Sequence, residues 1–418
     1  MSDDDVVQYV IIGGGLAAAR AVEGIREHDR EGAITVVSAE AHVPYERPPL
    51  SKDVLQGKSE ADVAFTHPEG WYGGQGVTLL LGQAATTISV DDRTVALADG
   101  TVLPWDRLLL ATGSVVRRLD VPGGDLPGVT YLRTMDESLA LLEKLRNGGD
   151  VVVVGAGWIG LEVAAAARQH GCTVTIIEPT TAPLLAVMGE RIGTWFADFH
   201  AAHGVTLMLG TGVSGFSGTE HVTGVNTDGG ETIAAQTVVV GVGIRPSTEL
   251  AETAGVAIDN GVVTDPALRT SVPGIWAAGD VANWESTLLG RHVRVEHWAN
   301  ANDSGLAAGR SMAGVDVTYD PVPFFFSDQY DAGLEYAGYV PRGTDSELVV
   351  RGDTAGNEFM AFWVVPEGDG VRVLAGMHVN VWDTIDAVQA LIRERAVVSR
   401  DRLADPSVSL DEVASDPS

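Results

Sequence analysis

Two glycine-rich segments have the residue types and spacing that could bind a dinucleotide. They are Gly13-x-Gly15-x-x-Ala18 and Gly155-x-Gly157-x-x-Gly160. Each follows an apolar run typical of a buried strand and precedes an alanine-rich run typical of a helix, which is the context that makes this spacing informative. Such glycines let the backbone approach a pyrophosphate, and the helix N-terminus adds a partial positive charge. A turn that only packs helix against strand is the simpler alternative for either copy alone.

A carboxylate at the end of the next strand would accept the ribose hydroxyls of the dinucleotide. In the second segment this residue is Glu178, 18 residues after Gly160. Its charge would repel the 2′-phosphate of NADP, and the following stretch EPTTAPLL contains no arginine, so we expect NADH rather than NADPH. In the first segment we expect Glu40 in this role. A solvated strand-end charge is the alternative for Glu178.

The elements that must position these residues recur along the chain. The order strand, glycine turn, helix, strand begins at VVQYVIIGGG and again, about 140 residues later, at DVVVVGAGWIG. Antiparallel meanders are expected within 77–114, where a buried strand returns at Leu108–Ala111, and within 216–243. Alternating runs after residue 322 and a helix over Thr384–Arg395 indicate a third, mixed domain, followed by a frayed polar tail. The predicted fold class is α/β, with two Rossmann-like dinucleotide-binding domains plus a C-terminal α+β domain.

Composition excludes several kinds of partner. The formal net charge of −30 argues against nucleic acid and anionic membranes, which require a basic surface. No apolar run reaches membrane-spanning length, and the N-terminus lacks a signal-peptide layout, so we expect a cytoplasmic protein. Cys172 is the only cysteine, which rules out a disulfide framework and a cysteine-ligated cluster. We expect Cys172 to be a small buried residue. No metal site is expected either, because no ligand set surrounds His292 and His297.

Seven segments occur in an order that resembles one family across residues 8–400. They are YERPPLSK, LLLATGS, GAGWIGLEVA, GVGIRPS, TSVPGIWAAGD, VEHWANA and FFFSDQYD. The chain resembles the FAD-dependent, NADH-using ferredoxin reductases of Rieske dioxygenases and bacterial haem monooxygenases. The resemblance implies a glutathione-reductase-like flavoprotein oxidoreductase that moves hydride from NADH onto FAD. Electrons then pass singly to a separate 2Fe–2S ferredoxin and so, indirectly, to an oxygenase.

The resemblance also implies roles for individual residues. Lys52 would lie at the isoalloxazine and pair with Glu162, and Trp298 would lie beside the flavin; these three are the candidate catalytic residues. An exposed helix charge is the alternative for Glu162, and a core tryptophan for Trp298. The expected FAD-binding residues are Gly13, Gly15, Ala18, Glu40, Arg47, Lys52, Thr112, Gly113, Asp280 and Trp298. The expected NAD-binding residues are Gly155, Gly157, Ile159, Gly160, Glu178 and Gly243.

The loop that carries Lys52 has an unusual composition. In PPLSK, Pro48 and Pro49 would stiffen the backbone and prevent an early helix, and Ser51 would cap a helix that follows. Two positions depart from the family pattern. Phe326 stands where the family often has tryptophan, and Ser247 where it usually has asparagine. Neither change removes a reacting group.

The expected domains are discontinuous. Residues 1–115 and 246–322 would form the FAD-binding domain, 116–245 the NAD-binding domain, 323–405 a C-terminal interface domain and 406–418 a polar tail. We expect a monomer or weak homodimer.

The sequence does not identify the protein or molecule that accepts the electrons. An acidic ferredoxin would be repelled by the net charge, so a local basic patch at Arg291, His292 and Arg294 is expected, or screening by high salt. One alternative is a reductase of the same scaffold with another acceptor, such as a rubredoxin or a quinone. Another is an NADH-sensing interaction flavoprotein resembling apoptosis-inducing factor.

Overall fold

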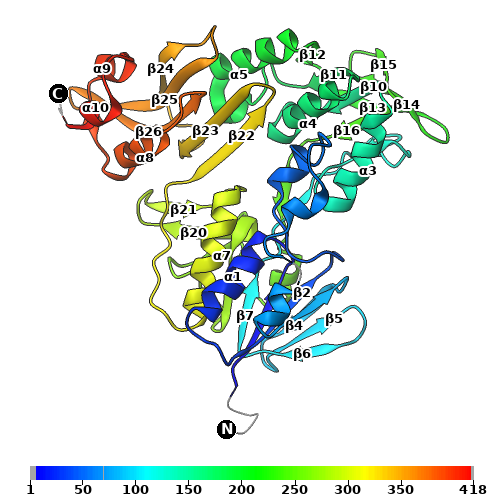
Figure 1. The fold of residues 1–418 in the computed structure, drawn as a ribbon, viewed down its shortest axis with the longest axis vertical. Helices are drawn as coiled ribbons and strands as arrows, with labels where there is room; N and C mark the ends of the chain where they lie inside the picture. The colour runs from blue at the N-terminus through cyan, green and yellow to red at the C-terminus, as the bar shows by residue number, and fades with distance from the viewer. Residues whose placement is uncertain (1–5, 69, 416–418) are drawn as a thin grey trace. The chain divides into compact units, whose positions relative to one another are not determined.

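The computed structural model describes residues 6–68 and 70–415 (Figure 1). The chain forms two compact units. Unit 1 comprises Met1–Tyr45, Thr66–Gly113 and Pro246–Ser418, and unit 2 comprises Glu46–Phe65 and Ser114–Arg245. The segment 46–65, which carries Arg47 and Lys52, therefore groups with the second glycine-rich segment. Residues 416–418 of the expected polar tail lie outside the described residues.

Unit 1 is built around a parallel sheet that begins with the first predicted strand. Its order is β19-β7-β1-β2-β3, and adjacent strands run parallel. The strands are β1 (Gln8–Ile12), β2 (Ala33–Ser38), β3 (Val77–Leu81), β7 (Arg107–Leu110) and β19 (Ile275–Ala277). The apolar residues of the inner strands β1 and β7 are buried on both faces, as expected for a covered parallel sheet, whereas in the edge strand β3 only Val77 is buried. The predicted strand–turn–helix–strand order is confirmed here.

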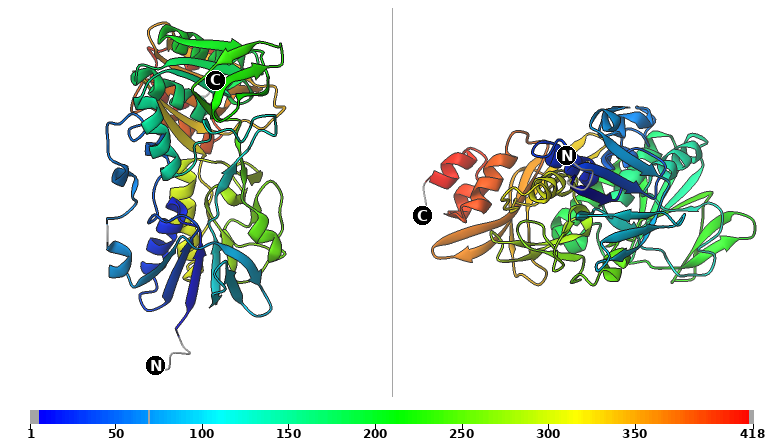
Figure 2. Two further views of the ribbon diagram at one scale, coloured as in Figure 1. Left: turned by 90° about the vertical axis from the view of Figure 1, so that its right-hand side faces the viewer. Right: turned by 90° about the horizontal axis from the view of Figure 1, so that it is seen from below.

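Two helices of unit 1 pack unusually close together. They are α1 (Leu16–Arg26) and α7 (Trp298–Met312), which lie side by side in Figures 1 and 2. A Cβ atom at Gly305 would overlap the carbonyl oxygen of Ala17, and one at Gly309 would overlap that of Ala21. Glycine at these two positions is therefore what lets the backbones approach. The close packing positions the N-terminus of α7 beside the sheet.

The expected meander of unit 1 is confirmed as the antiparallel sheet β4 (Ala85–Ser89), β5 (Thr94–Leu97) and β6 (Val102–Pro104). A second small sheet comprises β18 (Val262–Thr264), β20 (Ala282–Ser286) and β21 (Arg291–Val293). The short helices of these regions are α2 (Trp71–Gly74), α6 (Glu249–Thr253) and the 3-10 turn η4 (Gly279–Val281).

The C-terminal part of unit 1 is a mixed α+β region, as expected. Its sheet runs β22-β23-β26-β25-β24, with β27 on β26. The strands are β22 (Phe324–Gln329), β23 (Ala332–Gly338), β24 (Glu347–Asp353), β25 (Glu358–Glu367), β26 (Gly370–Val379) and β27 (Val397–Val398). The helices are α8 (Ile385–Arg393), α9 (Arg400–Ala404) and α10 (Leu410–Ser415). The expectation of a frayed tail is wrong for α10, because Leu410 and Val413 are buried in the core of this region.

Unit 2 repeats the parallel architecture. Its sheet order is β12-β11-β10-β16-β9. The strands are β9 (Val129–Thr130), β10 (Asp150–Val154), β11 (Thr173–Glu178), β12 (Val205–Leu209) and β16 (Thr237–Val240). The helices are α3 (Met135–Arg146), α4 (Trp158–Gln169) and α5 (Leu185–Ala202). The expected second meander is confirmed as the antiparallel β13 (Val213–Gly218), β14 (Val222–Thr227) and β15 (Thr232–Ala234).

The remaining elements lie near the points where the chain passes between the units. They are β8 (Ser114–Val116), β17 (Ile244–Pro246), and the 3-10 turns η2 (Pro48–Ser51) and η3 (Ala61–Ala64). The helix expected after Ser51 is absent: turns follow η2 over residues 52–57. Within the described residues no helix is long and apolar enough to cross a membrane.

Candidate functional site

The first glycine loop joins β1 to α1 and leaves room at one position. Gly13 has φ +132°, and a Cβ there would overlap the Ala111 carbonyl oxygen, so the tight turn requires glycine. By contrast, a Cβ built at Gly15 would have no heavy atom within 4 Å among the described residues other than Gly15 itself and its chain neighbours. Ala18 is fully buried where the helix packs on the sheet. The loop thus combines a strained turn, open space over the helix N-terminus and close helix packing.

Glu40 lies two residues beyond the end of β2, and its carboxylate accepts a hydrogen bond from the phenol of Tyr45. Tyr45 is buried and its backbone pairs with Gly15 in an isolated bridge. This pairing brings the start of the 43–55 loop beside the first glycine loop. The expected position of Glu40 near that loop is therefore met, while its role as a ribose ligand stays a prediction.

Three further predicted residues of unit 1 follow the carboxyl ends of neighbouring strands. Thr112 and Gly113 follow β7, and Asp280 follows β19. The hydroxyl of Thr112 donates to the Ser247 carbonyl at 2.8 Å, and Gly113 turns the chain with φ +65°. Because β1, β7 and β19 are parallel neighbours, these residues share one edge of the sheet with Gly13. Ligands of open α/β sheets bind at this edge.

The N-terminus of α7 joins the same edge. The backbone N–H of Gly279 donates to Ser304 of α7 at 2.9 Å, which ties the Asp280 turn to the helix. Trp298 is the first residue of α7 and is partly buried, and its ring meets Phe326 edge-on at 6.3 Å between centroids. Trp298 thus lies at this edge of the sheet, while its contact with a flavin stays a prediction.

His297, the N-cap residue of α7, was not predicted to belong to this edge. Its ring packs against Phe325 at 4.9 Å between centroids, and burial lowers the pKa of His297 to about 4, opposed by the nearby Asp280 carboxylate. Its Nδ1 atom has no hydrogen-bond partner among the described residues. Burial of this ring depends on β22, which joins the chain far along the sequence, so no local signal indicated it.

The second glycine loop joins β10 to α4 in unit 2 and needs glycine twice. Gly155 has φ +102°, and a Cβ there would meet the Gly241 carbonyl oxygen. A Cβ at Gly160 would overlap the Gly155 carbonyl oxygen, so any side chain would push α4 away from the turn. Apart from Gly157 and its chain neighbours, no heavy atom of the described residues lies within 4 Å of a Cβ built at Gly157. This loop too has open space over a helix N-terminus.

Glu178 is the last residue of β11, as expected, and its carboxylate lies at the second glycine loop. Oε2 accepts the backbone N–H of Ala156 at 2.7 Å, and Oε1 accepts the backbone N–H of Thr180 at 3.0 Å. The side chain is thereby held at the turn where a dinucleotide ribose would lie.

Two other predicted residues also lie at this end of unit 2. Ile159 is the second residue of α4 and has 43% of its surface exposed, and Gly243, with φ +97°, follows β16, the neighbour of β10. An exposed isoleucine at a helix N-terminus offers apolar surface to a ligand.

The structure brings Lys52 and Glu162 together. The ammonium Nζ of Lys52 donates to Glu162 Oε1 at 2.8 Å, and the two side chains are 12% and 4% exposed. Both residues belong to unit 2. The expectations that Glu162 is buried and that it pairs with Lys52 are confirmed, and the alternative of an exposed helix charge is wrong.

Ser51 does not cap a helix. It ends η2, is 3% exposed, and its hydroxyl donates to Glu162 Oε2 at 2.5 Å. A carboxylate buried this deeply needs a donor on each oxygen, which gives the hydroxyl a stronger partner than the backbone of a following turn. The two residues are 111 positions apart, so no spacing in the sequence indicated the contact.

Side chains of unit 2 anchor the loop that carries Ser51 and Lys52. The buried hydroxyl of Ser138 donates to the Leu50 carbonyl at 2.7 Å. A ring nitrogen of His170 lies 2.9 Å from the Leu55 carbonyl, and Arg47 donates to the carbonyl of Arg133. Arg47 is thus held just before the start of α3, while its contact with a flavin stays a prediction.

The expected basic patch is only partly basic. Arg294 pairs with Glu296 at 2.6 Å and donates to the Asp280 carbonyl. Arg291 and His292 are exposed on β21, but Glu285 lies opposite His292 in the sheet register. Cys172 is fully buried, as expected, and burial raises the pKa of its thiol.

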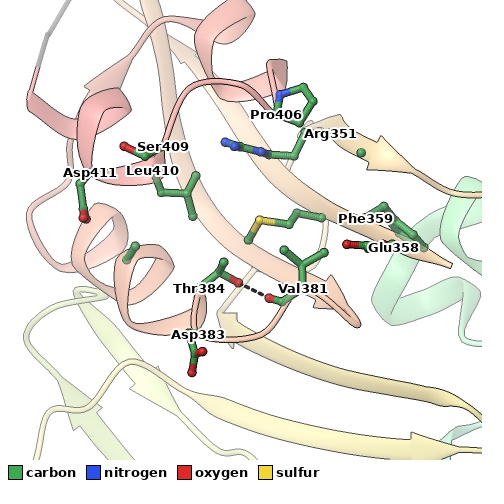
Figure 3. A pocket seen from close by; sticks show the side chains of 13 residues that line it. Arg351, Glu358, Phe359, Val381, Asp383, Thr384, Pro406, Ser409, Leu410 and Asp411 are labelled. Carbon is green, nitrogen blue, oxygen red and sulfur yellow. Dashed lines mark hydrogen bonds between the residues drawn. The ribbon is translucent and has the colours of Figure 1, made fainter. Parts of the chain in front are cut away.

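The C-terminal sheet bears a pocket of about 450 Å³ whose lining includes no predicted site residue (Figure 3). Arg351 extends from β24 toward Leu410, and the Thr384 hydroxyl donates to the Val381 carbonyl at 2.7 Å. Carboxylates of Glu358, Asp383 and Asp411 also line it. Within residues 6–68 and 70–415 no group of His, Cys, Asp or Glu is placed to bind a metal ion.

Comparison with known families gives matches along most of the chain. Residues 7–305 match the family described as pyridine nucleotide-disulphide oxidoreductase, and residues 324–414 match the one described as reductase C-terminal.

Curated relatives cover nearly the whole length. The ferredoxin–NAD(+) reductase component of an anthranilate 1,2-dioxygenase system from Burkholderia cepacia is 39% identical, over 96% of this chain and 98% of the relative. Putidaredoxin reductase from Pseudomonas putida is 35% identical, over 97% and 96%. Among solved structures, the covalent putidaredoxin reductase–putidaredoxin complex matches with a TM-score of 0.92 at 35% identity, covering 97% of this chain and 98% of that one.

Proposed function

The chain belongs to the family of pyridine nucleotide-disulphide oxidoreductases and is a ferredoxin–NAD(+) reductase that uses FAD and NAD(H); we propose that its acceptor is a separate 2Fe–2S ferredoxin that supplies an oxygenase. Similarity to ferredoxin reductases of dioxygenase systems over nearly the whole length carries this proposal. The type of iron–sulfur centre and the oxygenase rest on the resemblance, and a cytoplasmic location is a further part of the proposal that rests on the composition of the sequence.

The residues of the two glycine loops fit the two dinucleotides. Each loop leads into a helix N-terminus, whose partial positive charge favours an anion, and each has open space at Gly15 or at Gly157 for the close approach of a pyrophosphate. We assign FAD to the first loop. Glu40 and Asp280 would accept hydrogen bonds from its hydroxyl groups, and Thr112 and Gly113 would lie beside it at the carboxyl edge of the sheet. We assign NAD(H) to the second loop, with Glu178 on the ribose.

FAD, when bound, accepts two electrons as hydride from NADH and returns them one at a time to a ferredoxin. The residues of this chain bind the two dinucleotides, orient them and polarise the isoalloxazine. We propose that Lys52 presents a fixed positive charge to the isoalloxazine and that Glu162 keeps the ammonium in place. The N-terminus of α7, begun by Trp298, would add a partial positive charge.

The cysteine content limits the routes by which electrons can leave the flavin. The family name refers to disulphides, but Cys172 is the chain's only cysteine and is fully buried. A dithiol relay is therefore excluded. We propose that electrons leave for the ferredoxin directly, without passing through a cysteine.

The test is electron transfer by the FAD-loaded protein. With NADH it should reduce a 2Fe–2S ferredoxin encoded beside its gene, with NADPH giving much slower turnover. Ferricyanide reduction without reduction of any ferredoxin would contradict the proposal, and parallel assays with rubredoxin and a quinone would identify another acceptor. Slow reduction with a long-lived charge-transfer complex would instead favour the NADH-sensing alternative.

Sedimentation at several concentrations would test the proposed monomer or weak homodimer.

A further inference from the structure

We propose that Ser51 is a positioning residue: its hydroxyl orients the Glu162 carboxylate and, through it, the Lys52 ammonium. The inference rests on the proposed function, because it names a residue that prepares the Lys52–Glu162 pair for hydride transfer. Ser51 belongs to none of the groups of residues that the sequence assigned to either dinucleotide.

The geometry divides the carboxylate between two donors. Oε2 of Glu162 accepts the Ser51 hydroxyl at 2.5 Å, and Oε1 accepts the Lys52 ammonium at 2.8 Å. Ser51 and Glu162 are 3% and 4% exposed, so water competes little for either bond. Hydrogen bonds to an ionised group are about twice as strong as those between neutral groups. Together the two donors fix the plane of the carboxylate.

The backbone that carries Ser51 is held by the same unit that carries Glu162. Leu50 accepts the hydroxyl of Ser138, which is fully buried, and Leu55 accepts a ring nitrogen of His170. Ser51 and Lys52 lie between these two anchors. The contact between Ser51 and Glu162 is therefore a fixed property of unit 2 and does not depend on unit 1.

Loss of the hydroxyl would weaken the hold on one carboxylate oxygen. Glu162 would then rotate toward other donors or admit water, and the ammonium of Lys52 would follow its partner. The rotation of Glu162 and the shift of Lys52 do not involve the second glycine loop or Glu178. The affinity for the dinucleotide should therefore stay unchanged. A displacement of a reacting charge by a fraction of an ångström lowers the rate of the chemical step rather than the affinity.

The matched pair of variants is Ser51→Ala and Ser138→Ala. Each removes one buried hydroxyl from the anchoring of the same loop, but only the first touches Glu162. We expect Ser51→Ala to slow NADH-dependent bleaching of the bound flavin roughly tenfold. The dissociation constant for NAD+, measured by calorimetry, should stay within about twofold. Ser138→Ala should change the bleaching rate much less, and Ser51→Thr, which retains a hydroxyl, should recover most of it.

A double-variant cycle with Glu162→Gln gives a readout independent of turnover. Denaturant midpoints of wild type, Ser51→Ala, Glu162→Gln and the double variant should be non-additive, because the two side chains share one bond. Additive midpoints together with an unchanged bleaching rate in Ser51→Ala would overturn the inference. If wild-type flavin is not reduced by NADH at all, the proposed function fails instead, and the midpoint cycle still tests the Ser51–Glu162 contact.

Discussion

The two glycine loops share a backbone but differ in the groups that surround them. In unit 1 the helix after the loop, α1, buries alanines and packs against a glycine-containing face of α7. In unit 2 the helix after the loop, α4, buries the carboxylate of Glu162 and holds it against Lys52 and Ser51. The repeat thus provides two binding platforms, and only the second places a buried ion pair on the helix that follows its glycine loop.

The loops also differ at their third small residue and at their carboxylates. Ala18 is accommodated in unit 1, whereas Gly160 has no room for a methyl group. Glu40 accepts from a neighbouring tyrosine, whereas Glu178 accepts from the backbone of its own glycine loop. The same sequence motif therefore tolerates different substitutions in its two copies. The variants below test these differences in order of expected effect.

The largest effect on cofactor affinity is expected at the third small residue of the glycine motif, which is Gly160 in unit 2 and Ala18 in unit 1. Gly160→Ala should lower NAD+ affinity by roughly a hundredfold, because the added methyl group overlaps the Gly155 carbonyl and displaces α4. The reverse change in the other copy, Ala18→Gly, should destabilise the protein by only about 1 kcal/mol through helix propensity. Calorimetric titration with NAD+ measures the first, and thermal unfolding with FAD content measures the second. Equal tolerance of both changes would show that the two loops do not differ here.

The ion pair of unit 2 should give an effect of similar size on a different quantity, the rate of flavin reduction. Lys52→Met should slow flavin reduction by NADH roughly a hundredfold while FAD stays bound, because a fixed charge at the reacting centre is lost. Stopped-flow absorbance of the FAD-loaded variant measures the rate. Unchanged reduction kinetics would remove Lys52 from the mechanism.

The two carboxylates should separate the two dinucleotides. Glu178→Ser should weaken NADH binding about tenfold and narrow the preference over NADPH, since a ribose acceptor and a repulsive charge are both lost. Glu40→Gln should leave NADH binding unchanged and speed the release of FAD. Dissociation constants for both nicotinamide nucleotides and the flavin retained after gel filtration are the measurements. If each variant affected both cofactors, the assignment of one loop to each dinucleotide would be wrong.

The smallest effect concerns His297, a partly buried and neutral group of unit 1, in contrast to the Lys52–Glu162 salt bridge of unit 2. The pKa of His297 falls from 6.5 to about 4 because of burial. The folded state thus favours neutral histidine: its stabilisation is complete above the unfolded pKa and is lost as pH falls from about 6.5 to 4. His297→Gln should remove part of this loss in the free energy of unfolding. The part removed should be about 2 kcal/mol or less, since the His297 ring keeps some exposure. The test is the melting temperature of the wild type and of His297→Gln, measured from pH 7 to pH 4. If the two proteins lost stability equally over this range, the prediction would be wrong.

Local patterns in the sequence were enough to predict both platforms. The two glycine motifs, the strand before each and the end of β11 at Glu178 follow from backbone sterics and from the period of apolar residues. The burial of Glu162 could be inferred from its apolar neighbours in α4. Its pairing with Lys52 was implied by the resemblance to a family rather than by spacing.

Contacts between distant segments depended on the tertiary structure. The amino-acid sequence by itself determined two dinucleotide platforms, a single cysteine and the candidate residues at the strand ends, because these depend on neighbours a few positions away. Tertiary packing decided that Ser51 donates to Glu162 across 111 positions, that segment 46–65 groups with unit 2, and that Arg47 donates to the Arg133 carbonyl. A hydroxyl or a guanidinium can satisfy many partners, and only the packed fold determines which partner lies within 3 Å.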